Sequence, residues 1–145
     1  MLVLLDGGAP FYGCYETADG KYLAVGAIEP QSFAELLAGL GLSADEVPGQ
    51  LDVGSYPRMR SVFAERFARK TRDEWAGIFV GTDSCVTPVL TWNEAAADPH
   101  ITARATVLAA NGVEQAAPAP RFSRSRTPPV RTPPPGTAPL NDIGW

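Results

Sequence analysis

The stretch that most constrains the fold runs from Lys21 to Pro30, where an alternating apolar run ends in glycine and one carboxylate precedes a proline. The alternation predicts a β-strand over residues 21–27. Gly26 leaves room for a ligand or another backbone to come close. Pro30 suits the first position of a helix. We therefore predict that Glu29 lies at the seam between a strand and a helix.

Glu29 is the candidate functional residue of the chain, and its chemistry leaves two interpretations open. One is a helix-start charge, because a carboxylate near a helix N-terminus interacts favourably with the helix dipole. The other is a carboxylate placed where a ligand approaches the chain. Residue chemistry alone favours the first interpretation.

A β-hairpin is the clearest local prediction. Residues 11–17 and 21–27 are rich in aromatic and β-branched side chains, and Asp19-Gly20 between them is a hairpin-turn signal. Both faces of the second strand are apolar, so we expect the sheet to be covered on both sides or to meet a partner with one face. The two faces carry Tyr22, Ala24 and Gly26 on one side and Leu23, Val25 and Ala27 on the other.

Three helices are predicted to cover the hairpin. The first runs from Pro30 to a C-cap at Gly41, and the second begins at Pro57 after a loop over 47–56. The third follows a capping box at 71–74. The side chains expected to be buried are Phe33, Leu36, Leu37 and Leu40 in the first helix, Met59, Val62, Phe63, Ala64 and Phe67 in the second, and Trp75, Ile78 and Phe79 in the third.

Shorter elements follow. Residues 85–90 predict a short strand, which Pro88 confines to a sheet edge or a bulge because it lacks a backbone donor. Thr91 is expected to cap a short helix, which a break at 98–100 separates from a further helical turn. Asn111-Gly112 predicts the turn of a second hairpin.

The predicted fold class is α+β, with antiparallel hairpins packed with several helices and an extended proline-rich tail. We divide the chain into an entering linker (1–12), a small α+β domain (13–104), a returning hairpin or linker (105–120) and a Pro/Arg-rich tail (121–145). Because the tail lacks apolar periodicity, it is predicted to be mobile.

The distribution of charge argues against one class of binding partner. Residues 1–120 carry 8 basic and 15 acidic side chains, a net −7, whereas residues 121–145 carry 4 and 1, a net +3. An acidic body argues against nucleic acid as the main partner. No apolar run approaches the ~20 residues of a membrane span. Without a recognisable secretory signal, we expect a cytoplasmic protein.

Cysteine and histidine usage predicts neither a disulfide nor a metal site. Cys14 and Cys85 lack C-x-x-C spacing and are expected to be buried free thiols, with a redox role as a minor alternative. The single histidine, His100, has no Cys/His cluster around it. His100 is predicted to be structural or superficial, and Asp83 to cap a turn.

Four sequence blocks resemble the α-methylacyl-CoA racemases, members of the family III CoA-transferase superfamily. They are D-G-G-A-P-F-Y from Asp6, T-A-D-G-K-Y-L-A-V-G-A-I-E-P from Thr17, L-G-L from Leu40 and G-T-D-S-C-V-T-P-V-L-T from Gly81. The resemblance covers nearly the whole chain and implies the small, C-terminal domain of such an enzyme. It also implies a large N-terminal domain as partner, in cis or in trans, and a homodimeric full enzyme.

These enzymes interconvert R and S 2-methylacyl-CoA thioesters by removing and returning the α-proton through an enolate. They use no cofactor, since coenzyme A is part of the substrate. Their acid/base pair is a His and an Asp from the large domain, and neither matches a position here. Glu29 matches the family's active-site glutamate, which implies that it orients or tunes that pair. The chain alone is therefore expected to be inactive.

Two alternatives stay open beside the racemase. The chain could be a non-catalytic small domain that acts as a dimerisation or binding module, or part of a CoA-transferring member of the family. The tripeptide A-I-E before Pro30 favours the racemase, since the transferring members tend to have a glycine-rich segment there.

Overall fold

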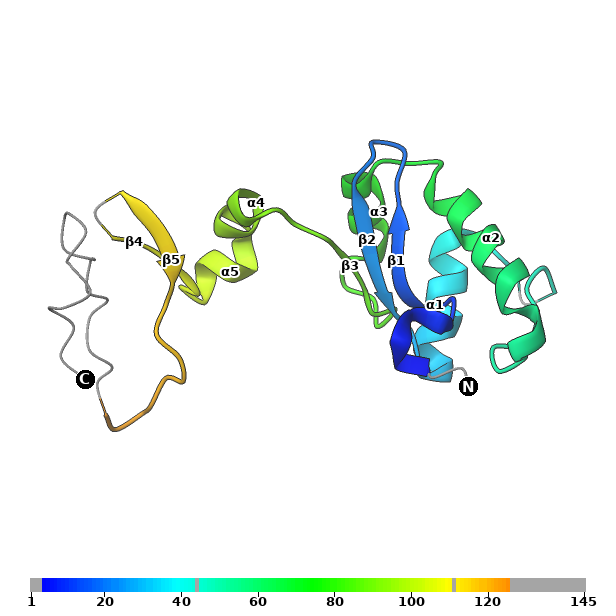
Figure 1. Cartoon of the computed structure of the whole chain (residues 1–145), viewed down its shortest axis with the longest axis horizontal. Coiled ribbons are helices and arrows are strands. Elements are labelled where there is room, and N and C mark those ends of the chain that lie inside the picture. Colours follow the sequence, from blue (N-terminus) through cyan, green and yellow to red (C-terminus); the bar gives the residue numbers. More distant parts are fainter. Residues whose placement is uncertain (1–3, 44, 111, 126–145) are drawn as a thin grey trace, which may run out of the picture. The chain divides into compact units, whose positions relative to one another are not determined.

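The structure is a computed structural model that describes residues 4–43, 45–110 and 112–125. The chain forms two compact units, Met1–Val89 and Leu90–Trp145. Both are drawn in Figure 1, and each is described here by itself. The linker and domain ranges predicted from the sequence stay predictions, and most of the proline-rich tail lies outside the described residues.

The first unit is built on a three-stranded antiparallel sheet in the order β1-β2-β3. The predicted hairpin is confirmed, with Tyr12 opposite Gly26 and Glu16 opposite Tyr22. At its turn Gly20 has a φ of 72°, a left-handed conformation that suits glycine. The predicted edge strand is also confirmed beside β2. The strands are β1 (Tyr12–Glu16), β2 (Tyr22–Gly26) and β3 (Val86–Pro88).

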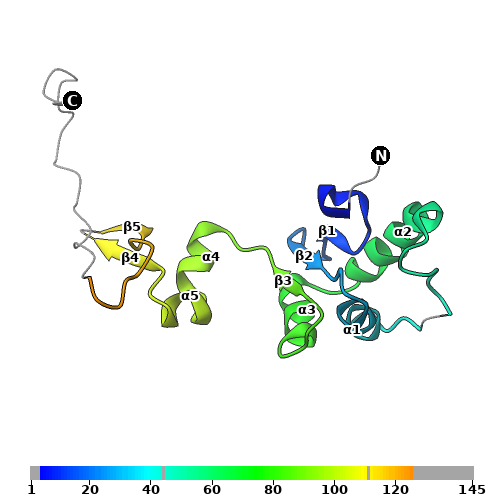
Figure 2. The same cartoon turned by 90° about the horizontal axis from the view of Figure 1, so that it is seen from below.

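Three helices lie on one side of this sheet (Figures 1 and 2). The first ends at Gly41, whose φ of 65° forms the predicted left-handed cap. The third begins with the predicted capping box, in which Thr71 and Glu74 bond to each other's backbone N–H groups. The helices are α1 (Pro30–Leu40), α2 (Tyr56–Phe67) and α3 (Arg72–Phe79), and the single turns are η1 (Leu4–Gly8) and η2 (Val53–Ser55).

Aromatic side chains fill the space between the sheet and the helices. Tyr15 of β1 stacks on Phe67 of α2 with ring centroids 5.0 Å apart, and Phe67 meets Trp75 of α3 edge-on at 5.5 Å. Two polar groups of this core bond to main-chain oxygens: the Tyr15 hydroxyl donates to Pro10 O at 2.5 Å, and Trp75 Nε1 donates to Phe67 O at 2.8 Å. The buried Tyr56 hydroxyl has no hydrogen-bond partner among the described residues. The core therefore links every layer of the first unit.

Three local predictions need correction. Ala64 is exposed, because the buried stripe of α2 follows Met59, Phe63 and Phe67 at four-residue spacing and Ala64 lies one position off it. Ile78 is 39% exposed for the same reason, next to buried Phe79. The predicted loop over 47–56 contains the turn η2, which leads directly into α2.

The sheet is covered on one face within the first unit. Leu23, Val25 and Ala27 are buried under the helices, whereas Tyr22 on the opposite face is 45% exposed. The expected alternation is thus confirmed. Within this unit the second face is left uncovered, because α1, α2 and α3 all lie on the same side, so the alternative that this face meets a partner stays a prediction.

The second unit consists of two short helices followed by a hairpin. Thr91 caps the first helix with a capping box, and Asp98 accepts from the N–H groups of His100 and Ile101 at the start of the second. The second hairpin is confirmed, although Asn111 of its turn lies outside the described residues. The elements are α4 (Trp92–Ala97), α5 (Pro99–Ala103), β4 (Val107–Ala110) and β5 (Val113–Ala116). No helix in the described ranges is long and apolar enough to cross a membrane.

Candidate functional site

Glu29 lies at the seam that the sequence predicts, between the end of β2 at Gly26 and the start of α1 at Pro30. Its backbone is extended, with φ −69° and ψ 142°, and its carbonyl accepts the N–H of Phe33 at 2.9 Å. The side chain is exposed. Its carboxylate makes no capping hydrogen bond to the first N–H groups of α1. The Glu29 carboxylate is therefore exposed, whereas the Glu29 backbone is held by its bond to Phe33.

The loop between α1 and α2 supports this seam through Gln50. The Gln50 side-chain amide donates from Nε2 to Ile28 O at 2.7 Å and to Ala27 O at 3.2 Å. Sequence reasoning missed this residue, because a glutamine in a loop without periodicity carries no signal of a partner more than 20 residues away. The contact brings the loop against the seam at the two positions before Glu29.

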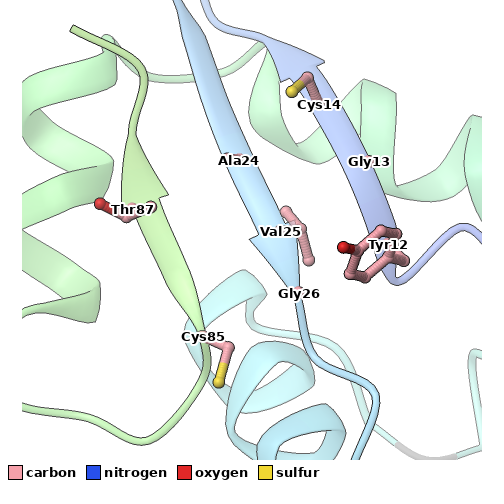
Figure 3. A pocket seen from close by; sticks show the side chains of 8 residues that line it. All are labelled: Tyr12, Gly13, Cys14, Ala24, Val25, Gly26, Cys85 and Thr87. Atoms are coloured by element: carbon pink, nitrogen blue, oxygen red, sulfur yellow. The ribbon is translucent and has the colours of Figure 1, made fainter. Parts of the chain in front are cut away.

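A groove opens on the uncovered face of the sheet, ending near the seam (Figure 3). It has a volume of about 370 Å³. All eight lining residues are uncharged, so it suits an apolar ligand or surface rather than an anion. The small residues Cys14, Ala24 and Gly26, which share this face, could have revealed the hollow in the sequence. The groove is lined by Tyr12, Gly13, Cys14, Ala24, Val25, Gly26, Cys85 and Thr87.

Gly26 keeps this groove open at its end closest in sequence to Glu29. A methyl group there would lie 3.8 Å from Cys85 O and 4.0 Å from the Tyr12 ring, which are ordinary contact distances. The Gly26 N–H donates to Cys85 O at 2.9 Å, so another backbone does approach this glycine. The glycine is therefore not needed to avoid a clash, and a larger side chain at this position would narrow the groove.

The two cysteines are free thiols, as expected, but both are exposed, and the prediction that they are buried is wrong. The physical reason is the strand alternation, which turns Cys14 away from the helices and toward the groove, where Cys85 also lies (Figure 3). Cys85 has a φ of 53°, a left-handed conformation that costs a non-glycine residue ~1 kcal/mol. Its thiol lies 3.9 Å from Ser32 Oγ in the first turn of α1.

The other polar candidates, Asp83 and His100, make local contacts of their own. Asp83 is exposed, and its backbone N–H donates to the Glu35 carboxylate on α1. His100 is exposed in the second unit, where its backbone N–H bonds to Asp98 at 2.9 Å. Within the described ranges, no group of three or more His, Cys, Asp or Glu side chains could hold a metal ion. The site thus offers one carboxylate beside an uncharged groove.

Comparison with known proteins identifies the family. The sequence pattern of CoA-transferase family III matches residues 4–138. The chain is 52% identical to mouse (Mus musculus) alpha-methylacyl-CoA racemase over 127 residues, which are 88% of this chain and 33% of that protein. It is 56% identical to the human (Homo sapiens) alpha-methylacyl-CoA racemase over 97 residues, which are 67% of this chain and 25% of that protein.

A solved structure supports the fold. Crystalline Rv3272 from Mycobacterium tuberculosis superposes with a TM-score of 0.64 at 18% identity, over 79% of this chain and 35% of that one. Because the family pattern matches residues 4–138, the chain belongs to CoA-transferase family III. Within it, the two mammalian relatives are racemases by name, and this chain spans about a third of the mouse protein and a quarter of the human one.

Proposed function

We propose that this chain is the small-domain portion of an acyl-CoA racemase, which interconverts R and S 2-methylacyl-CoA by removing and returning the α-proton through an enolate. The observation that carries the proposal is the position of Glu29. The residue aligned by motif with the family's active-site glutamate is exposed on an anchored strand-to-helix seam. The identity of 52% to a racemase over most of the chain supports the same assignment.

In this proposal Glu29 supports catalysis and performs no proton transfer itself. The acid and base are the His and Asp that the family resemblance assigns to the large domain. A carboxylate beside them favours the protonated form of a neighbouring acid, because two like charges close together disfavour ionisation. It also accepts a hydrogen bond from a neighbouring imidazole, which fixes the ring's tautomer. No cofactor takes part, since coenzyme A belongs to the substrate.

The experiment is α-proton exchange in deuterated water. The chain is mixed with a polypeptide containing the part of mouse racemase outside the matched region, and loss of the C2 proton signal of a 2-methylacyl-CoA is followed by NMR. We expect exchange from the mixture and none from either component alone. Glu29→Gln keeps the size of the side chain and removes its charge, and should slow exchange by at least about tenfold, the lower end of the range for a residue that orients other active-site groups.

Glu65→Gln is the matched control. Glu65 is an exposed carboxylate on α2, and the same substitution there changes the net charge equally. Exchange by this variant should equal that of the unmodified mixture. If both halves are folded and associated and yet no exchange occurs, the racemase proposal fails.

A second candidate is a non-catalytic module that dimerises through its uncovered sheet face. The groove and the 45% exposure of Tyr22 on that face favour it. Sedimentation would then show a dimer of the chain, and Gly26→Val, which narrows the groove, would weaken it. A monomer at all concentrations with no dye-binding apolar surface would exclude this candidate.

A further inference from the structure

One polar side chain outside the motif blocks makes a contact directed at the site. Gln50 donates both of its hydrogen bonds to main-chain carbonyl oxygens, Ile28 O at 2.7 Å and Ala27 O at 3.2 Å. Because a carbonyl only accepts, the amide nitrogen of Gln50, and not its oxygen, must face the seam. The orientation of the amide is thereby fixed by its partners.

The two carbonyls need such a donor because they lie between regular elements. β2 ends at Gly26 and α1 begins at Pro30, so Ala27 and Ile28 belong to neither the sheet ladder nor the helix. Ala27 is fully buried, where an unpaired main-chain oxygen is costly. Gln50 therefore donates to the carbonyl oxygens of Ala27 and Ile28, which neither the sheet nor the helix pairs.

Gln50 is itself held in place by its loop. The Asp52 N–H donates to Gly49 O at 2.9 Å and closes a turn around Gln50. Val47 three residues earlier is only 6% exposed and anchors the loop in the hydrophobic core. The donor is thus carried on an ordered turn.

We propose that Gln50 is the positioning residue for Glu29. The inference rests on the proposed function, because it names the residue that aims the supporting carboxylate. Since no capping hydrogen bond to α1 holds the Glu29 side chain, the direction of its carboxylate depends on its backbone. That backbone is fixed by Phe33 N–H on the helix side and by Gln50 on the strand side.

The test substitutes Gln50→Met, which keeps the length of the side chain and removes its donor. Gln31→Met is the matched control, because Gln31 is exposed in the first turn of α1, two residues after Glu29, and the substitution is the same. Nitrogen-15 relaxation of the full chain reports order at the Ile28 and Glu29 amides. Rigid backbone has order parameters of about 0.85 and flexible backbone below about 0.6.

We expect Gln50→Met to lower the order parameters of Ile28 and Glu29 toward about 0.6 while the β1 and β2 amides keep theirs. Gln31→Met should change neither. In the exchange assay with the complementing racemase polypeptide, Gln50→Met should reduce kcat several-fold and leave KM within twofold. A merely structural role would instead lower the amount of folded protein, which the relaxation spectra reveal directly.

The outcomes separate this inference from the proposed function. If Ile28 and Glu29 stay rigid in Gln50→Met, or if kcat is unchanged while Glu29→Gln slows exchange, Gln50 does not position Glu29 although the racemase proposal stands. If Glu29→Gln leaves exchange unaltered, the supporting role of Glu29 fails, and with it the functional meaning of its positioning. Loss of local order together with lower kcat in Gln50→Met alone supports the inference.

Discussion

The two units of the chain are stabilised in different ways. In the first unit, Met1–Val89, strands and helices enclose an aromatic core in which Phe11, Phe63 and Phe67 have no exposed surface. In the second unit, no described residue from Leu90 to Ser125 is buried, and Trp92 is 51% exposed. Its helices are held by caps and its hairpin by the strand ladder. The two units therefore share similar helix caps and hairpins but differ greatly in the amount of tertiary packing.

This difference bears on the site. Glu29 is carried by the unit with the packed core, so its backbone can be placed by α1 and by Gln50 without help from the second unit. Hydrophobic burial is the dominant favourable term in folding, and local hydrogen bonds contribute little net stability each. We therefore expect the first unit to unfold cooperatively and the second to open locally at lower cost.

The largest expected effect is the loss of a core ring. Phe67→Ala removes a fully buried side chain that contacts Tyr15 and Trp75, and should lower the free energy of unfolding of the first unit by about 3–5 kcal/mol. Trp92→Ala removes a larger but exposed ring and should change the free energy of unfolding of the first unit by less than about 0.5 kcal/mol. Urea unfolding followed by the fluorescence of buried Trp75 measures both. If Phe67→Ala and Trp92→Ala changed the free energy of unfolding equally, the difference in packing between the two units would be contradicted.

The next effect is a loss of stability at high pH, confined to the first unit. Burial raises the pKa of the Tyr15 hydroxyl from 10.0 to about 12, against a smaller opposing effect of the Arg60 charge. Between these values the folded state keeps a proton that the unfolded state releases. The stabilisation linked to the raised pKa of Tyr15 is therefore complete below pH 10 and is lost as pH rises through about 12. Its loss lowers the free energy of unfolding by about 2–3 kcal/mol.

Unfolding of the chain at increasing pH, followed by urea titration, measures this contribution. Tyr15→Phe should be less stable at pH 8, because the bond to Pro10 O is lost, but less sensitive to pH above 10. A native Tyr15 that ionises near pH 10 in ultraviolet absorbance would overturn the prediction.

The smallest effect compares the same cap in the two units. Thr71 and Thr91 both begin capping boxes with a glutamate three residues later. Thr71→Ala should reduce the stability of the first unit by about 1 kcal/mol, since α3 is part of its core. Thr91→Ala should speed amide hydrogen exchange in α4 and leave protection in β1 and β2 unchanged. If Thr91→Ala also lowers protection in the sheet, the two units are not energetically separate.

The sequence predicts the parts of the fold whose signals are local. The Asp19-Gly20 turn, the apolar spacing of α1 and the Thr71 and Thr91 caps each act within a few residues, and the structure has all of them. The position of Glu29 between strand and helix was likewise predictable, because Gly26 and Pro30 mark the ends of the two elements.

The features that the sequence did not predict depend on contacts between segments that are far apart in the sequence. The Gln50 bonds join residues separated by 22 and 23 positions, and a loop glutamine has no preferred partner. Cys14 was expected to be a buried free thiol from cysteine spacing and a reducing compartment, neither of which says which face of the sheet is covered. Only the placement of all three helices on one side exposes it.

The most direct test of the central claim is the rate of C2 proton exchange in 2-methylacyl-CoA by the chain and its complementing racemase polypeptide. We expect exchange that requires both components, is slowed at least about tenfold by Glu29→Gln and is unaffected by Glu65→Gln. Equal rates for the unmodified chain and Glu29→Gln would contradict it, because the carboxylate at the seam would then have no part in catalysis.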